Sequence, residues 1–428
     1  MFILRTAHLG AACLFYVASL SAASALPALR EEAAPSSAIP PPLRDAVRAV
    51  WNASPEVQAG RAELDAARAR ARAADRPMYN PALELGVENA DVDRRTAELS
   101  LALDLSGKRR ARSDQGLAQL RISEASFDGL RRDVAGRWLK AWASASLAAR
   151  QSALGRHRVE LMERFDTLAA LRLKVGDISS PERDLAGLAL GEAQTQQASL
   201  IGNEGAARAS LLGIGGDKAL MPPPLPDSAP PTLVGFEPRP IEDLVEFSEA
   251  RARLQNADAA IQVATRARVP DPTISLTGGQ VHDGPISDRV IGLKVSIPLP
   301  VFNTGRAEVD TARAEADAAA ATLQSRRWTL SAAQQEARGR YDALRSATEA
   351  FRSGRAAAFE DRATLLEGLW SAGEISTSDY LVQLKQSLDT ALSGLDLESR
   401  AWQAWFDYLS SAGRLTEWID GRTQDAPR

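Results

Sequence analysis

The chain has 428 residues, of which 45% are hydrophobic, 25% charged and 5% aromatic. These proportions exclude a disordered chain and a helical membrane protein with many spans. Glycine and proline together are close to their average frequency, which excludes collagen-like and low-complexity classes. The formal net charge is −4, so nothing in the composition indicates nucleic-acid binding.

Residues 1–25 have the pattern of a cleavable export signal. Arg5 precedes an apolar stretch from Leu9 to Leu20, and small residues come before the expected cleavage site. A short membrane anchor is the alternative, which is disfavoured because the stretch is short and a Pro-rich spacer follows over 26–42. Cys13, the single cysteine, lies inside the signal, where lipidation is a minor alternative. We therefore expect a mature chain without disulfides or thiolate metal sites.

Sequence landmarks recur in the same order in the two halves of the chain. Asn80-Pro81 recurs in kind as Asp271-Pro272, and the segment after Val175 resembles the segment after Ala372. Runs of alternating apolar residues and Gly-basic openings of Ala-rich helices recur between them. We infer a tandem duplication, with repeats over 43–213 and 239–418, a Pro-rich linker over 214–238 and a tail over 419–428.

Each repeat is expected to contain a helix, two short strands and a long helical hairpin. The first helix is predicted over 57–77, and it ends near a proline. The strands are predicted at about 82–88, 97–105, 273–278 and 290–299, with polar loops over 89–96 and 279–289.

A proline-free segment from Gly107 to Lys174 predicts one continuous helix. At about 1.5 Å per residue it would reach roughly 100 Å, which no compact domain of this size needs. Its apolar residues favour steps of seven, which is typical of a coiled coil. A short turn separates it from the return helix, which we expect Ser180 to cap, with Pro181 in the first turn.

The strand at 290–299 alternates between apolar and polar residues. Ile291, Leu293 and Val295 share one face, whereas Gly292 and Lys294 lie on the other. This pattern fits either a transmembrane β-barrel or a soluble sheet with one buried face. Four short strands cannot close a barrel alone, so the membrane interpretation requires several copies of the chain to share one barrel.

Together, the signal, the duplicated order, the Gly-acidic turns and the segment from Ile297 to Asn303 before Gly305-Arg306-Ala307 resemble the TolC family of outer-membrane efflux proteins. The resemblance implies a mainly α fold with a small transmembrane β part. In it, tandem-duplicated long helical hairpins form a coiled-coil α-barrel, and four strands per chain contribute to a trimeric 12-stranded β-barrel. The Ile297–Asn303 segment further resembles the cobalt-zinc-cadmium branch.

This resemblance also implies a function and partners. A homotrimer in outer-membrane lipid would be the passive exit duct of a tripartite efflux system, with a periplasmic adaptor and an inner-membrane pump of the resistance-nodulation-division type. Divalent heavy-metal cations are the expected cargo, and drugs or small solutes are the alternative. A periplasmic coiled-coil adaptor is an alternative of a different class, disfavoured because an adaptor usually has one hairpin between β-rich domains. Motifs of zinc proteases, nucleotide-binding proteins and serine hydrolases are absent from the sequence, so we expect no enzyme, no cofactor and no bound metal.

Two acidic residues are candidates for the channel gate. In the family a ring of aspartates follows the second hairpin turn, and counting from Gly373 places the first at Asp379. The second position holds Val382, which puts a double ring in doubt. Glu182 is the equivalent acid of the first repeat. Both acids have an alternative role, since a carboxylate at a helix N-terminus interacts favourably with the macrodipole.

The two hairpin turns match the tip motif of the family, which the resemblance implies meets the adaptor. Alternatively, Gly176 and Gly373 only end helices with a positive φ angle. The docking candidates are Val175, Gly176, Asp177, Ile178, Ser179, Ala372, Gly373, Glu374, Ile375 and Ser376.

An aromatic cluster lies near the end of the last long helix. It consists of Trp402, Trp405, Phe406 and Tyr408. We expect it to pack in a central region between helices, in preference to a membrane-interface belt.

Overall fold

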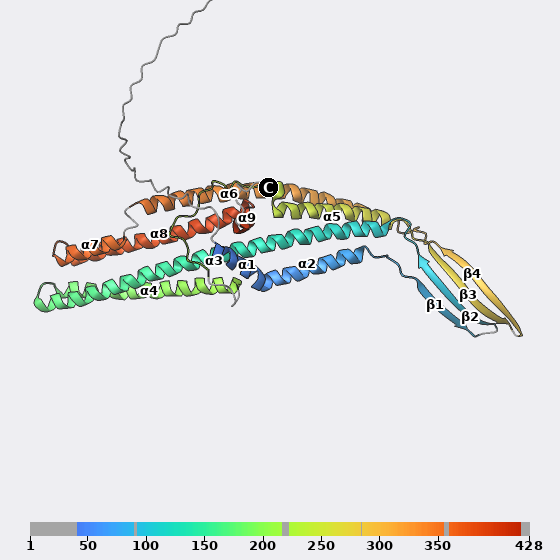
Figure 1. The fold of residues 1–428 in the computed structure, drawn as a ribbon, viewed down its shortest axis with the longest axis horizontal. Coiled ribbons are helices and arrows are strands. Elements are labelled where there is room, and N and C mark those ends of the chain that lie inside the picture. The colour runs from blue at the N-terminus through green and yellow to red at the C-terminus, as the bar shows by residue number, and fades with distance from the viewer. Residues whose placement is uncertain (1–40, 90–91, 216–221, 284, 355–358, 421–428) are drawn as a thin grey trace, which may run out of the picture. The chain divides into compact units, whose positions relative to one another are not determined.

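The computed structural model describes residues 41–89, 92–215, 222–283, 285–354 and 359–420 (Figure 1). All of them belong to one unit of the chain, Ser37–Arg428. The predicted export signal, the spacer up to residue 40 and the tail from residue 421 lie outside the described residues.

The first repeat follows the expected order, with one further helix at its start. Its elements are α1 (Pro41–Ala53), α2 (Pro55–Ala74), β1 (Ala82–Glu88), β2 (Asp93–Ala102), α3 (Lys108–Val175) and α4 (Ser180–Gly215). Prolines at the start of α1 fit there because the first turn of a helix needs no backbone donor. Ser54 separates α1 from α2, since Pro55 forces it into extended geometry (φ −63°, ψ 122°).

The second repeat has the same order but a divided outgoing arm. After the 3₁₀ turn η1 (Ile241–Asp243) come α5 (Val245–Ala267), β3 (Thr273–Asp283), β4 (Ile286–Ser296), α6 (Arg306–Ser353), α7 (Phe359–Ser371), α8 (Thr377–Ser411) and α9 (Leu415–Asp420). The helix α6 ends at Ser353 because Gly354 adopts extended backbone (φ −84°, ψ 164°). In the first repeat the corresponding arm is the single 68-residue helix α3, about 100 Å long.

Four antiparallel strands form one sheet in the order β1-β2-β3-β4. The central pair, β2 with β3, joins the two repeats through partners such as Leu99 and Leu276. Figure 1 shows the sheet beyond the ends of α2 and α3.

The strands extend further toward the loops than the sequence predicts. Residues 93–96 and 279–283 were expected in loops, yet they pair within β2 and β3. Backbone pairing does not require apolar side chains, so a ladder continues past the alternating pattern. At the other end β4 stops at Ser296, before Pro298, which has no backbone donor.

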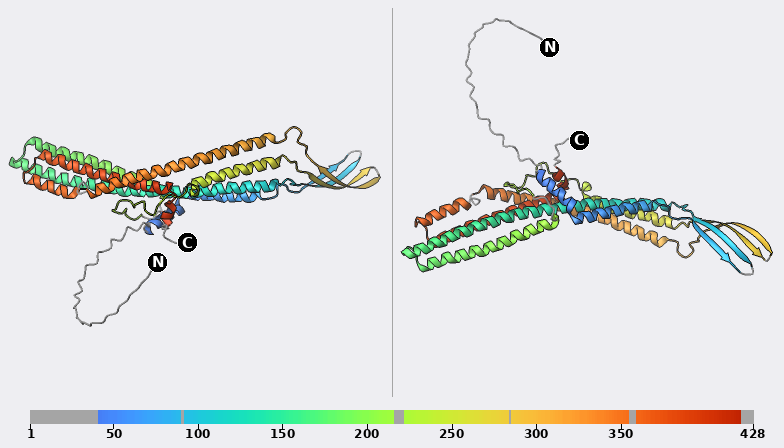
Figure 2. Two further views of the ribbon diagram at one scale, coloured as in Figure 1. Left: turned by 90° about the horizontal axis from the view of Figure 1, so that it is seen from above. Right: turned by 60° about the horizontal axis from the view of Figure 1, so that its bottom comes forward.

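The long helices of the two repeats pack together. The helix α3 contacts α2, α4, α5 and α8, and α6 contacts α5 and α8. Figure 2 shows the hairpin α3/α4 beside the hairpin formed by α7 and α8. None of the helices in the described ranges is long and apolar enough to cross a membrane.

One buried core lies where α1, α3, α6, α8, α9 and the linker meet. The predicted aromatic cluster is part of it, since Trp402, Trp405, Phe406 and Tyr408 are all buried. The linker is bound to these helices by side-chain donors. Trp142 Nε1 donates to the Pro223 carbonyl at 2.9 Å, and the Tyr408 hydroxyl donates to the Phe236 carbonyl at 2.7 Å.

Candidate functional site

The two hairpin turns have the same backbone geometry. Gly176 and Gly373 have φ angles of 82° and 77°, in the left-handed region that favours glycine. The amide of Asp177 donates to the Arg172 carbonyl at 2.9 Å, and the amide of Glu374 donates to the Leu369 carbonyl at 2.9 Å. Each of these hydrogen bonds links an amide to the carbonyl five residues earlier, which defines the Schellman motif. The motif provides hydrogen-bond donors for carbonyl groups in the last turns of α3 and α7.

The turns divide their side chains between the core and the surface. Ile178 and Ile375 pack against a second buried cluster, formed by α3, α4, α7 and α8. Val175 is 73% exposed. Among the other docking candidates, Asp177 and Glu374 are also exposed. Each turn therefore offers a small apolar and acidic surface, held from beneath by an isoleucine.

Serine residues cap both return helices, and the acidic gate candidates complete the caps. Ser179 donates from its backbone amide and its hydroxyl to the Glu182 carboxylate, both at 2.8 Å. Ser376 Oγ accepts from the Asp379 amide at 3.1 Å and donates to its carboxylate at 2.7 Å. The prediction of Ser180 as the cap is wrong by one residue, because the Ser179 carbonyl already accepts the first helical bond, from the Arg183 amide.

Glu182 and Asp379 occupy equivalent positions, three residues after their caps. Asp379 is exposed and Glu182 is partly exposed. The backbone and hydroxyl donors of Ser179 lower the pKa of Glu182 below its usual value. Val382, at the second expected aspartate position, is 65% exposed on α8. The structure gives both acids a capping role, and their role in a constriction stays a prediction.

An aromatic group that the sequence did not reveal joins the ends of the two hairpins. The ring centroids of Phe165 and Trp370 are 4.5 Å apart, and those of Trp370 and Tyr380 are 5.5 Å apart. Trp370 Nε1 donates to Thr377 Oγ1 at 3.2 Å. Burial raises the pKa of Tyr380 to about 12. The only sequence signal was that Trp370 and Tyr380 lie close before and after the second turn.

The sheet has an apolar face that is exposed in the single chain. Register places Leu83, Leu99, Leu276 and Leu293 in one row across the four strands. Their exposed fractions are 67%, 51%, 54% and 73%. A soluble sheet with one buried face would cover this row, so the exposure does not support that alternative.

The opposite face of the sheet is polar and acidic. Register places five acidic and two basic side chains on it, namely Glu84, Glu88, Glu98, Asp283, Asp288, Arg94 and Lys294. Arg94 lies 3.8 Å from the Glu88 carboxylate, and Thr277 donates to Glu98 at 3.2 Å. The excess of carboxylates makes the potential over this face attractive to cations.

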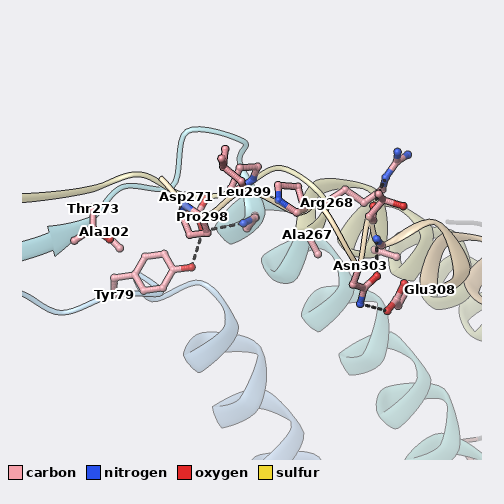
Figure 3. Close-up of a pocket in the computed structure, with 16 residues that line it drawn as sticks. Tyr79, Ala102, Ala267, Arg268, Asp271, Thr273, Pro298, Leu299, Asn303 and Glu308 are labelled. Atoms are coloured by element: carbon pink, nitrogen blue, oxygen red, sulfur yellow. Dashed lines mark hydrogen bonds and ion pairs between the residues drawn. The ribbon is translucent and has the colours of Figure 1, made fainter. Parts of the chain in front are cut away.

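At the junction between the sheet and the helices, a buried ion pair connects the repeats beside an open cavity of about 620 Å³ (Figure 3). Asp271 Oδ2 accepts from the Tyr79 hydroxyl at 2.5 Å and from Lys108 Nζ at 2.8 Å. Both charged side chains are largely buried, with exposed fractions of 6% and 13%. In the sequence, Asp271 stands out only because Asp271-Pro272 corresponds to Asn80-Pro81 of the first repeat. Its partners come from the other repeat.

We found no assembly of three or more His, Cys, Asp and Glu side chains that could hold a metal ion among the residues that the structure describes.

Comparisons with known proteins agree with this architecture. Residues 245–407 match the sequence model of the outer membrane efflux protein family. The cobalt-zinc-cadmium resistance protein CzcC of Cupriavidus metallidurans is 24% identical over 244 residues, which are 55% of this chain. The matched region spans 57% of the length of that relative.

Solved structures have the same fold. A membrane protein from Pseudomonas aeruginosa superimposes with a TM-score of 0.72 at 21% identity, covering 88% of this chain and 95% of that one. A structure of CusC, described in terms of folding and transmembrane channel formation, also has a TM-score of 0.72, at 14% identity, covering 90% and 95% of the two chains. The predicted fold of long helical hairpins with four antiparallel strands is thereby confirmed.

Proposed function

We propose that this chain is a channel of the outer membrane efflux protein family, whose sequence model residues 245–407 match, and that it forms the outer-membrane exit duct of a tripartite system that exports divalent heavy-metal cations. The exposed apolar face of the sheet carries the proposal. That face would contact lipid, and the acidic face would line a water-filled pore.

Such a pore requires several copies of the chain, and the resemblance to the family gives their number as three. Within the described residues, β1 and β4 each have a strand partner on one side only. An open edge cannot lie in hydrocarbon, because its backbone groups would lack hydrogen bonds. Three copies would pair these edges into a closed barrel of twelve strands, and the long helices would form a tunnel on the periplasmic side. An export signal at 1–25 would deliver the chain there.

The hairpin turns are the proposed docking surface for the periplasmic adaptor. The length of α3, about 100 Å, separates the turn at Gly176 from the sheet, so this turn would lie far from the outer membrane. An inner-membrane pump of the resistance-nodulation-division type would supply the cargo through the adaptor. Three copies each of Asp379 and Glu182 would bring carboxylates together near the entrance and attract cations.

Heavy-metal cargo rests on two observations. The relative named as a cobalt-zinc-cadmium resistance protein supplies the first. The second is the acidic face of the sheet, which would concentrate cations over anions in the pore. The proposal of a metal cargo therefore rests on different observations from the proposal of an exit duct. An experiment can overturn the metal cargo and leave the duct intact.

Growth and conductance experiments test these proposals. Deleting the gene should sensitise the host to Zn²⁺, Co²⁺ and Cd²⁺, and expression from a plasmid should restore growth. The purified trimer in a planar bilayer should pass K⁺ in preference to Cl⁻. Sensitisation to drugs alone would leave the duct intact and overturn the metal cargo, whereas a soluble monomer in the periplasm would overturn the duct.

A further inference from the structure

We infer that Arg95 and Arg289 form a binding site for phosphate-bearing lipid head groups at the outer margin of the apolar sheet face. This inference rests on the proposed membrane insertion of the sheet. Gln280 pairs with Arg95 in β2 and with Arg289 in β4. The three side chains therefore lie in one row on one face, with the two arginines about 10 Å apart.

The row lies directly beyond the apolar part of that face. The adjacent row lies two residues along each strand, in the direction away from the loops. It contains Leu85, Ala97, Gly278 and Ile291. From Arg289 to Ile297 the chain advances eight residues, about 27 Å at an extended rise, which at a strand tilt of roughly 40° spans about 20 Å of the roughly 25 Å height of a lipid-facing apolar band. The two arginines are thus placed at the level of head groups, where a lipid-facing charge costs little.

Both arginines are available to an external anion. Each is exposed. Among the described residues neither guanidinium has an ion-pair partner, although Asp93 lies one row further out, opposite His282. The patch is therefore cationic on balance. Arg94, the sequence neighbour on the opposite face, lies 3.8 Å from Glu88. An unpaired arginine beside an apolar surface can extend its stem over lipid and bind phosphate through paired donors.

A phosphate-bearing lipid fits the row better than a protein partner. The row continues a face whose other members are exposed hydrophobic side chains, such as Leu85 at 72% and Ile291 at 84%. A ligand that covers both parts needs acyl chains next to a negative head group. Lipids with a phosphomonoester have this combination of chemical groups.

The test uses the full chain in detergent micelles and measures its melting temperature as dioleoyl phosphatidic acid is added. A ligand that binds the folded state raises the melting temperature, so we expect a rise with phosphatidic acid that exceeds the rise with dioleoyl phosphatidylcholine. The rise should be lost in the double variant Arg95→Gln/Arg289→Gln and fall by roughly half in each single variant. Arg94→Gln, the matched control, should keep it.

Several outcomes would overturn the inference. A double variant that responds like the unchanged chain would do so, as would inorganic phosphate that produces the same rise without lipid. If the double variant does not fold, the single variants decide. Flotation with phosphatidylcholine vesicles separates this inference from the proposed duct. A chain that inserts but shows no arginine-dependent response overturns only the lipid site, whereas a chain that never inserts overturns both.

Discussion

The guanidinium of Arg172 lies 4.5 Å from the centre of the Trp370 ring. It also donates to the Trp370 carbonyl at 3.4 Å and to the Ser371 carbonyl at 2.8 Å. Arg172 is in the last turn of α3 and Trp370 is near the end of α7, so one side chain caps the outgoing arm of the other repeat. The two hairpin turns, which are the proposed docking surface, are thereby held in one arrangement, and an adaptor would meet them together.

Replacing this arginine should loosen the turns. Arg172→Ala removes a cation over an aromatic ring and a donor to helix-terminal carbonyls, and we expect a loss of about 1–2 kcal/mol in the free energy of unfolding. Thermal or urea unfolding in detergent measures this loss. Arg164→Ala, at an exposed position of the same helix, should change stability by less than about 0.5 kcal/mol. Equal effects of the two variants would contradict the capping role.

Replacing glycine by alanine should have opposite effects on the free energy of unfolding at two positions where there is space for a side chain. A Cβ at Gly176 or Gly191 would meet no atom within 4 Å. Gly176 has a φ angle of 82°, so Gly176→Ala should cost about 1 kcal/mol through backbone strain alone. Gly191 is exposed within α4, where alanine favours the helix and should stabilise it by up to about 1 kcal/mol. Unfolding experiments on both variants check the contrast, and a stabilising Gly176→Ala would refute the turn geometry.

Replacing only one partner of the ion pair between Asp271 and Lys108 should lower the free energy of unfolding more than replacing both partners. Asp271→Asn leaves the largely buried ammonium of Lys108 without its counterion, and we expect a loss of about 3–5 kcal/mol. The double variant Asp271→Asn/Lys108→Met should recover much of that loss, because no unpaired charge stays buried. A double-mutant cycle by denaturation measures the coupling. Additive losses would mean that the two side chains do not interact.

Acidification should weaken the cap of α4. The pKa of Glu182 is lowered from 4.5 by the Ser179 donors, so its stabilising contribution is present above pH 4.5 and is lost as the pH falls through the lowered value. The melting temperature of Glu182→Gln should therefore fall less between pH 6 and pH 3 than that of the unchanged chain. Glu163→Gln, exposed on α3, is the control. Parallel pH profiles for all three proteins would exclude a titrating cap at Glu182.

The sequence was sufficient to predict the bounds of a helix or strand where a single residue type determines the backbone conformation. The helix predicted from Gly107 to Lys174 spans Lys108–Val175 in the structure, because glycines with positive φ angles bound it at both ends. The strand β1 has its predicted bounds, Ala82–Glu88, and Pro81 directly precedes it. The ends of β2 and β3 were misplaced because backbone pairing with a distant strand, and not the apolar pattern, fixes them.

The sequence alone determined the helical hairpins, the alternating strands and the glycine turns, because each of them depends on interactions among near neighbours. Only the tertiary structure decided that β2 pairs with β3, that Asp271 meets Lys108 and Tyr79, and that Arg172 caps α7. Each of these contacts joins residues from different repeats. Such long-range contacts depend on how the two repeats pack, which no local pattern in the chain specifies.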